Sequence, residues 1–318
     1  MSSNHSRPVL RLIAVLLTLC SAAGAAQAST RTWVSGAGSD ANPCTRSAPC
    51  LTFAHTLSQT TAGGEIDVLD SGDFGAVTIT QAVSIVANGT LATIQVTSGN
   101  AITVNAGAND IVVLKGLSLD GEGTANDGIN FTAGGTLHVE SCTINRFANI
   151  GIDIAPPSTN GKVFIKDSIV RDNGIGSTGG GIYFNPTFGQ GNSVIASVDA
   201  TRMENNIVGL KAFGLSSVVV RNSISTQNAF SGFSAVQTGP TMNLFLENSE
   251  SSYNGTNGIT CSGALSPQHP IIHITNMVIT GNATGMAIAN NCEIISFSNN
   301  KNDGNTTNGS PTSTVSQQ

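Results

Sequence analysis

The residues of this sequence with the clearest chemical potential are a few acidic side chains in its central part. Asp120, Glu122 and Asp127 lie close together along the chain, and Asp127 belongs to the segment Asn126-Asp127-Gly128-Ile129. A glycoside hydrolase needs two carboxyl groups flanking the scissile bond, one of them held protonated. Asp127 is therefore a catalytic candidate, with the alternative that Asp-Gly is simply a turn dipeptide.

A polysaccharide lyase would need different groups. Such an enzyme removes a proton beside a uronate carboxylate and uses a basic side chain for the purpose. Asp153 and Lys211 are the catalytic candidates for this chemistry because we expect them on one face; Lys166, Arg171 and Arg221 belong to no recognisable motif. Calcium-dependent lyases hold the ion with clustered carboxylates. The acidic residues here are scattered, so we identify no cofactor or metal site, and Ca²⁺ has no support in the sequence.

A row of polar residues follows a repeated pair of glycine and an apolar residue. The row contains the four candidates for substrate binding, namely Asn130, Asp153, Tyr183 and Lys211. On one flat face, such residues would suit a sugar, with the aromatic ring stacking on it and the polar groups bonding its hydroxyls. The alternative is an ordinary solvated face of a sheet, which carries no function.

The elements that must position these residues are short strands in a repeat. An apolar anchor recurs about every 26 residues, an interval typical of a solenoid. Another apolar residue precedes each anchor by two positions, which is the period of a strand. The pattern predicts a parallel β-helix of about ten coils, with one coil per repeat. The anchors are Val113, Val139, Ile165, Val198, Val220, Leu246, Ile274 and Phe297.

The position after the anchor carries charges of alternating sign. In successive repeats it is occupied by Glu140, Lys166, Asp199, Arg221 and Glu247. We interpret the row as support for strand pairing, since opposite charges on adjacent strands contribute about 0.2–1 kcal/mol each. A binding stripe is the alternative.

The two ends of the chain differ from the repeat. Residues 1–28 read as a secretory signal peptide, with Arg7 and Arg11, an apolar run and an Ala-Gln-Ala cleavage site. Residues 29–73 are expected to form an N-terminal cap containing a helix over 49–60, whose Leu51, Ala54 and Leu57 share one face. Residues 74–305 would form the β-helix.

The polar residues 306–318 are expected to be a flexible tail. The last coil then has no cap of its own, so a partner, the tail or an oligomer formed through that end would have to cover it.

The cysteines fit an exported protein. Cys44 and Cys50 flank a short loop and predict a small disulfide. Cys142 replaces a small residue of the repeat, so we expect it to be buried. Cys261 and Cys292 fall in adjacent coils and could pair, but spacing alone does not fix the geometry.

Composition excludes some classes of function. Charged residues make up 10% of the 318 residues, and the net charge is −6. A nucleic-acid partner needs a basic face, so we expect none. The apolar run of the signal peptide is too short to span a bilayer, and no other stretch of the sequence reads as transmembrane. We expect export through the secretory pathway, to the periplasm, the cell surface or the medium.

The N-terminal motifs resemble those of a known group of proteins. The segment from Trp33 to Cys44, the run Ala-Pro-Cys-Leu-Thr-Phe-Ala-His-Thr-Leu and the run Gly-Gly-Glu-Ile-Asp-Val-Leu are similar to the N-terminal cap of the pectin-lyase-like superfamily, closest to its uncharacterised secreted bacterial members. The resemblance implies an all-β, right-handed parallel β-helix with a short capping α-helix. It does not imply one activity, because that superfamily contains lyases, hydrolases, epimerases and adhesins.

Three hypotheses of function follow. The first is an exported protein that interacts with a polysaccharide and lacks identifiable catalytic residues. The second is a polysaccharide lyase or glycoside hydrolase acting on the outward face of the β-helix. The third is a structural or adhesive surface protein.

Overall fold

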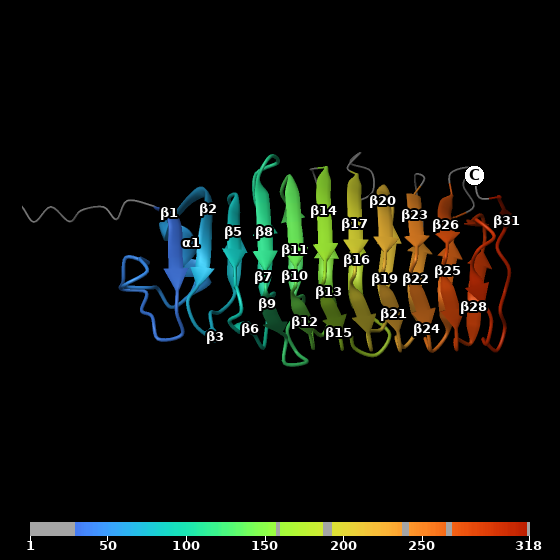
Figure 1. The fold of residues 1–318 in the computed structure, drawn as a ribbon, viewed down its shortest axis with the longest axis horizontal. Helices are drawn as coiled ribbons and strands as arrows, with labels where there is room; N and C mark the ends of the chain where they lie inside the picture. Colours follow the sequence, from blue (N-terminus) through green and yellow to red (C-terminus); the bar gives the residue numbers. More distant parts are fainter. Residues whose placement is uncertain (1–28, 157–159, 187–192, 237–241, 265–268, 317–318) are drawn as a thin grey trace, which may run out of the picture.

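Three parallel sheets wind around one core in this computed structural model, which describes residues 29–156, 160–186, 193–236, 242–264 and 269–316 (Figure 1). Each coil contributes one strand to each sheet, and the smallest sheet has nine strands, so the described residues form nine complete coils. This is the expected parallel β-helix, with slightly fewer coils than the ten we predicted. The expected signal peptide lies outside the described residues.

The nine-stranded sheet carries the polar row introduced above. Its strands are β4 (Val77–Ile79), β7 (Ile102–Asn105), β10 (Ile129–Ala133), β13 (Ile150–Ile154), β16 (Gly180–Phe184), β19 (Leu210–Phe213), β22 (Ser231–Val236), β25 (Asn257–Ser262) and β28 (Thr284–Ala289).

The twelve-stranded sheet carries the alternating charges and spans both ends of the molecule. Its strands are β1 (Ser29–Val34), β2 (Thr60–Val68), β5 (Val83–Val86), β8 (Ile111–Lys115), β11 (Thr136–Glu140), β14 (Gly161–Lys166), β17 (Val194–Asp199), β20 (Ser216–Arg221), β23 (Met242–Glu247), β26 (Pro270–Thr275), β29 (Glu293–Ser296) and β31 (Ser313–Thr314).

The ten-stranded sheet has the shortest strands. These are β3 (Gly72–Asp73), β6 (Ala92–Gln95), β9 (Leu117–Asp120), β12 (Thr143–Asn145), β15 (Ile169–Arg171), β18 (Arg202–Glu204), β21 (Ile224–Thr226), β24 (Glu250–Ser252), β27 (Val278–Thr280) and β30 (Lys301–Asn302).

Stacks of apolar side chains fill the space between the sheets. Ala196, Val218 and Leu244 are paired in register, and so are Val198, Val220 and Leu246; all six side chains are almost completely buried. Two anchors of the predicted repeat were wrong by one residue. Val139 pairs with Leu114 rather than Val113, and Ile274 pairs with Ser296 rather than Phe297. Val113 and Phe297 therefore point outward.

Buried asparagines hold one corner of successive coils. In each pair, the side-chain oxygen of one asparagine accepts the backbone N–H of its counterpart in the preceding coil, as Asn228 does for Asn206 at 3.0 Å. Burial without a partner would cost each amide about 1–3 kcal/mol. The ladder is formed by the buried Asn173, Asn206, Asn228, Asn254 and Asn282 and ends at Asn305, which is half-buried.

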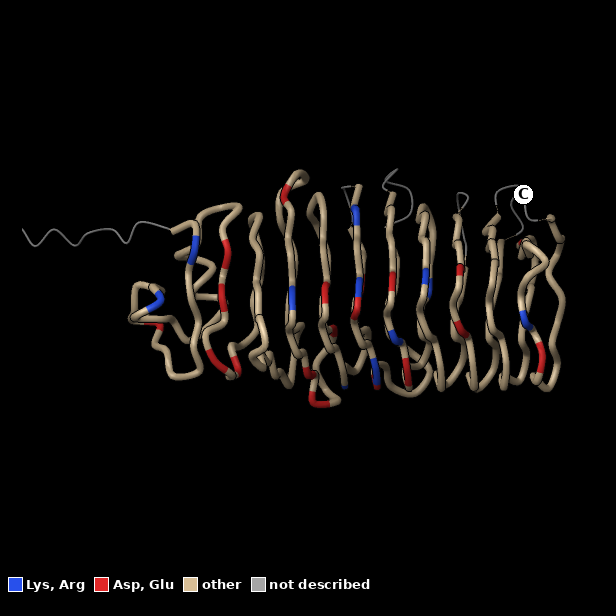
Figure 2. Tube along the Cα trace, viewed as in Figure 1, with Lys and Arg blue, Asp and Glu red and all other residues tan. Residues whose placement is uncertain are grey.

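The row of charges lies in the predicted register. Glu140, Lys166, Asp199, Arg221 and Glu247 are successive pairing partners, and Figure 2 shows their signs alternating along neighbouring strands. Arg221 and Glu247 form an ion pair at 2.8 Å. Lys166 instead lies 3.8 Å from Asp167.

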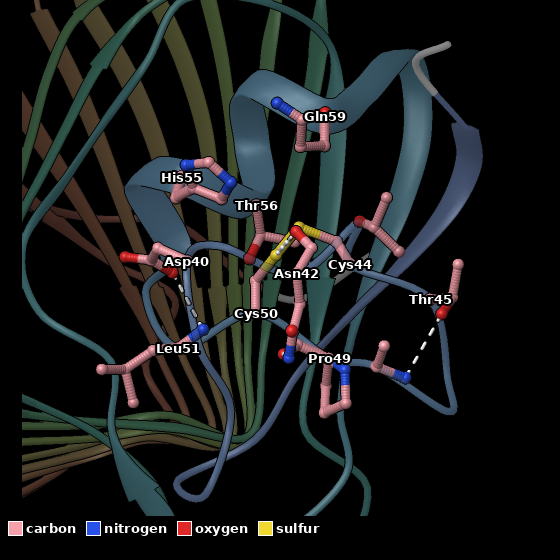
Figure 3. Close-up of a disulfide and its surroundings, with 12 residues drawn as sticks. Asp40, Asn42, Cys44, Thr45, Pro49, Cys50, Leu51, His55, Thr56 and Gln59 are labelled. Carbon is pink, nitrogen blue, oxygen red and sulfur yellow. Dashed lines mark hydrogen bonds between the residues drawn. A yellow bond between two sulfur atoms is a disulfide. The ribbon is translucent and has the colours of Figure 1, made fainter. Parts of the chain in front are cut away.

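The N-terminal helix covers the first coil, but it is shorter than predicted. Helix α1 is Phe53–Gln59, because the Thr52 side chain caps it by accepting the N–H of His55. Phe53, Thr56 and Leu57 are its buried residues. Two of the three residues on the predicted face are exposed instead, namely Ala54 and Leu51, the latter at 37%. The Leu51 N–H donates to Asp40 (Figure 3), which keeps Leu51 outside the helix.

The cap and the solenoid overlap. β1 and β2 already belong to the twelve-stranded sheet, and β2 begins at Thr60, within the segment that we expected to form the cap. The predicted Cys44–Cys50 disulfide lies below α1 (Figure 3). Cys261 and Cys292 also form a disulfide, and Cys142 is buried.

The C-terminal segment differs from the flexible tail that its composition indicated. Its backbone continues the coil: Thr307 and Asn308 accept the N–H groups of Gly285 and Met286, and β31 pairs with β29. Composition alone suggested disorder because the segment buries few apolar side chains. The open strand edges of the last coil supply the hydrogen-bond partners that composition cannot reveal.

Candidate functional site

The predicted polar row lies on the outer face of the nine-stranded sheet. Asn130, Asp153, Tyr183 and Lys211 are successive pairing partners on β10, β13, β16 and β19. Their flanking residues, such as Ile152 and Ile154 around Asp153, are fully buried in the core. Adjacent strands lie about 4.8 Å apart, so the four side chains fall within a span of about 15 Å along the helix axis.

Asp127 joins this row from the turn before β10. Its side chain is 5% exposed and accepts three hydrogen bonds, from the Ile150 N–H at 3.0 Å, from Asn149 at 2.8 Å and from Asn130 at 3.2 Å. Burial raises the pKa of Asp127, and the three donors oppose this effect. Asp127 is thus an acceptor held in a fixed orientation.

Asp153 is in the opposite situation. Its Oδ1 atom is buried without a hydrogen-bond partner among the described residues. Burial, with a smaller contribution from the charge of Asp127, raises the pKa of Asp153 to about 7. The Oδ1 atom of Asn130 is likewise buried without a partner in the described part of the chain. Two oxygens without partners therefore occur on adjacent strands of the row.

Tyr183 supports the row rather than forming its surface. The side chain is 9% exposed and packs with Ile150 and Val208, while its hydroxyl donates to the carbonyl oxygen of Gly179. Burial, followed by the charge of Asp153, raises the pKa of Tyr183 to about 12. A ring enclosed in this way has little surface for stacking on a sugar.

Lys211 places a positive charge over aromatic rings. Its ammonium nitrogen lies 4.6 Å from the ring centroid of Phe213 and 5.7 Å from that of Tyr183. Both distances are within the range of a cation–π interaction. Burial lowers the pKa of Lys211. Among the residues that the structure describes, no carboxylate forms an ion pair with it.

Other sequence candidates lie apart from this row. Arg146 forms ion pairs with both Asp120 and Glu122, so these two acids are engaged with a cation at a corner of the coil, whereas Asp127 is held by Asn149, Ile150 and Asn130. Lys166, Arg171 and Arg221 belong to the other two sheets. Cys44, Cys50 and His55 are close enough to hold a metal ion, but the two cysteines are disulfide-bonded to each other.

Two neighbours of the site were missed at the level of sequence. Asn149 is the nearest donor to Asp127, and Phe213 carries the closest ring to Lys211. Phe213 follows Lys211 by two positions, so it points to the same outward face by strand periodicity. That spacing could have identified it. Asn149 lies in a turn, where the two-residue period of a strand does not indicate which way a side chain points.

The chemistry available in the row combines hydrogen bonding with proton transfer. A carboxyl group with a pKa near 7 can donate a proton at neutral pH, and a neighbouring carboxylate held by N–H donors can remain charged. A partly desolvated lysine can bind an anion or accept a proton once neutral.

Comparisons with known proteins identify the fold. No family model matches the chain, and no curated protein matches it. Among solved structures, the chain is similar to the crystal structure of the pectate lyase Pel9A, with 15% identity, a TM-score of 0.52, and coverage of 85% of this chain and 70% of that one. It is also similar to a lacto-N-biosidase of family GH136 from Eubacterium ramulus, with 12% identity, a TM-score of 0.49, and coverage of 91% and 67%.

No helix among the described residues is long and apolar enough to cross a membrane. At such low identity, structural similarity identifies the fold alone. The chain therefore has the parallel β-helix fold that its resemblance to the pectin-lyase-like superfamily implied.

Proposed function

We propose that this protein is exported and binds a polysaccharide along the outer face of the nine-stranded sheet, at Asn130, Asp153 and Lys211. The observation that carries the proposal is the pair of buried oxygens without partners, Oδ1 of Asn130 and Oδ1 of Asp153. Leaving such an atom unpaired costs about 1–3 kcal/mol. If the side chain turned outward on binding, a sugar hydroxyl donating to its oxygen would recover that cost.

The rest of the row fits the same ligand class. A pyranose chain presents many hydroxyl groups along a line, and this face presents polar groups on consecutive strands. Lys211, which has no carboxylate in an ion pair among the described residues, could bind a sugar hydroxyl or a uronate carboxylate. In this proposal the ring of Tyr183 lies under the Lys211 ammonium and positions it, and the ring makes little contact with the ligand. The shared fold with a pectate lyase supports a polysaccharide as the ligand class.

Export is part of the proposal. Two disulfides in one chain are typical of proteins from oxidising compartments. The apolar stretch at residues 12–19, with its basic flank, supports the same conclusion from the sequence.

The test is a binding screen of the mature protein. Isothermal titration calorimetry with xylan, β-glucan, galactan and polygalacturonate should identify a ligand. Lys211→Met keeps the apolar stem of the side chain and should weaken binding at least tenfold. Lys162→Met, on the exposed face of another sheet, is the matched control and should bind normally. If none of these polysaccharides binds, the proposal fails and a structural or adhesive surface role is favoured.

A second candidate function is cleavage of the bound chain. The observation in its favour is that Asp153 has a pKa of about 7 and lies near Asp127, whose carboxylate accepts three hydrogen bonds. Asp153 would protonate the leaving oxygen of a glycosidic bond, and Asp127 would act on water or on the sugar. For a uronate polymer, Lys211 in its neutral form would instead take the proton beside the carboxylate. The bond from that sugar ring to the leaving oxygen would break as the double bond forms, and Asp153 would protonate the leaving oxygen.

Cleavage is tested by its products. Reducing ends indicate hydrolysis, and absorbance of an unsaturated sugar indicates a lyase. Asp153→Asn should reduce hydrolysis at least a hundredfold, and the wild-type rate should fall as pH rises through 7. A polysaccharide that binds but gives neither product, over a range of pH, leaves binding as the function and excludes cleavage of that polymer.

A further inference from the structure

A second surface lies on the twelve-stranded sheet, away from the row just described. Toward the C-terminal end of its outer face, Val219, Phe245 and His273 are pairing partners on β20, β23 and β26. The rings of Phe245 and His273 stack with centroids 4.5 Å apart and an interplanar angle of 7°. Val219 stands next in this ladder and has no ring, so the face of Phe245 opposite His273 is left without a stacking partner.

A hollow opens over this part of the sheet. Its volume is about 300 Å³, at the lower end of the range for small-molecule sites. Val219, Phe245, His273 and Phe297 provide an apolar lining. Phe297 is here because of the register correction above, which turns it outward. Phe245 is 37% exposed, so part of its ring remains open to a ligand.

The rim of the hollow is polar but carries no net charge. Arg221 and Glu247, which both line the hollow, form an ion pair at 2.8 Å, and Thr275 follows on the next strand. Burial lowers the pKa of His273, which keeps its ring neutral at neutral pH. An anionic ligand would have to compete with Glu247 for Arg221. An entirely apolar ligand would leave the charged pair desolvated without compensation.

We propose that this hollow is a binding site for one ring of a neutral sugar. The ring would occupy the gap above Val219, with its apolar C–H face against Phe245 and its hydroxyls reaching Arg221, Glu247 and Thr275. Adjacent strands lie about 4.8 Å apart, so a sugar ring above Val219 would continue the stack of His273 and Phe245 at about that spacing. The site is separate from the proposed polysaccharide row, because it lies on a different sheet.

Two variants of this site test the proposal. The ligands are cellohexaose, maltohexaose and mannohexaose as neutral probes, and hexagalacturonate as the charged probe, titrated into the mature protein up to millimolar concentration. We expect at least one neutral probe to bind more tightly than hexagalacturonate. Phe245→Ala removes the stacking surface and should weaken that binding at least tenfold. Val219→Phe fills the gap while preserving the strand, and should abolish the same binding.

The matched control is Phe164→Ala. Phe164 lies in the same outward row, is 40% exposed and stacks on His138 with centroids 4.9 Å apart, but it does not line the hollow. It should leave binding unchanged, as should Lys162→Met, which alters neither the hollow nor the row on the other sheet. A circular dichroism spectrum and a melting temperature equal to those of the wild type would establish that each variant is folded. Equal binding by wild type and Val219→Phe, or binding of hexagalacturonate alone, would overturn the proposal.

Discussion

At the scale of single residues, the buried environment of Asp153 disfavours the ionised form of its carboxyl group. Its carboxyl is largely buried and has one oxygen without a partner, and an isosteric amide would fit the same space at a lower electrostatic cost. A residue with a purely structural role would gain from that substitution. An acid at this position is therefore consistent with a role in binding or proton transfer.

The pKa of Asp153 predicts how stability depends on pH. Because folding raises the pKa from 3.8 to about 7, the protonated form stabilises the native state below pH 4, and this contribution is lost as pH rises through 7. Asp153→Asn should therefore stabilise the protein at pH 8, by at most about 4 kcal/mol, since each pKa unit is worth about 1.4 kcal/mol.

Urea unfolding at pH 4 and pH 8 measures the effect. The gain for Asp153→Asn should be present at pH 8 and small at pH 4, while Asp167→Asn at an exposed corner should change little at either pH. Equal stability of wild type and Asp153→Asn at pH 8 would mean that the carboxyl is solvated, contrary to this account.

The sequence could place the residues of the row but not their surroundings. Strand periodicity correctly put Asn130, Asp153, Tyr183 and Lys211 on one face. It gave no sign that Tyr183 is covered by Ile150 and Val208, which come from turns and strand ends of neighbouring coils. Burial depends on how coils pack against each other, and a period of two residues carries no information about that.

At the scale of elements, the buried asparagine ladder and the C-terminal segment hold the coils together. Asn228 is the middle of the ladder, since it accepts the N–H of Asn206 and its own N–H donates to Asn254. Asn228→Ala should destabilise the protein by about 1–3 kcal/mol. In thermal melting, Asn228→Ala should lower the transition temperature without changing the circular dichroism spectrum of the folded state.

A surface amide provides the comparison. Asn243 lies on the outer face of β23 and has no part in the ladder, so Asn243→Ala should cost less than about 0.5 kcal/mol. Equal losses for Asn228→Ala and Asn243→Ala would contradict a stabilising role for the ladder.

The C-terminal segment is predicted to cap the solenoid. Residues 306–316 give backbone hydrogen-bond partners to β28, the last strand of the nine-stranded sheet, and to β29, which only β31 follows in the twelve-stranded sheet. Removing residues 306–318 would expose those strand edges and the end of the core. The truncated protein should melt at a lower temperature and associate with itself at high concentration, as measured by sedimentation velocity. A monomer of unchanged melting temperature would show that the segment has no capping role.

The errors of prediction at this scale share one cause. Phe297 was placed in the core because Ile295 and Phe297 alternate like the other anchors, but Ser296 is the residue paired with Ile274. A stretch with apolar residues on both faces fits either register, and only the pairing with the preceding coil decides between them. The same ambiguity affected Val113, which lies in the apolar run Ile111-Val112-Val113-Leu114.

At the scale of the whole molecule, the repeat was enough to predict the architecture. A chain with apolar residues at alternate positions, turn residues at fixed offsets and too little room for a long helix in each unit has few other solutions. The apolar anchors gave the strand register, and the alternating charges in the position after them are paired in that register on the twelve-stranded sheet (Figure 2). Function was harder to predict, since the solenoid offers three outer faces and the repeat places polar residues on all of them.

Two faces stand out once side chains are placed. The nine-stranded sheet carries oxygens without partners and a lysine over aromatic rings, while the twelve-stranded sheet carries a stacked aromatic ladder with a gap. A rigid solenoid holds both sets of groups at fixed spacing along one axis, so little ordering is required when an extended ligand binds.

The most direct test of this account is a crystal structure with a hexasaccharide of the polymer that binds most tightly in the screen. We predict a sugar on the outer face of the nine-stranded sheet, with a hydroxyl within hydrogen-bond distance of Oδ1 of Asp153 or Oδ1 of Asn130 and another oxygen near the Lys211 ammonium. A hexasaccharide bound with full occupancy elsewhere, leaving both oxygens without partners, would contradict the account.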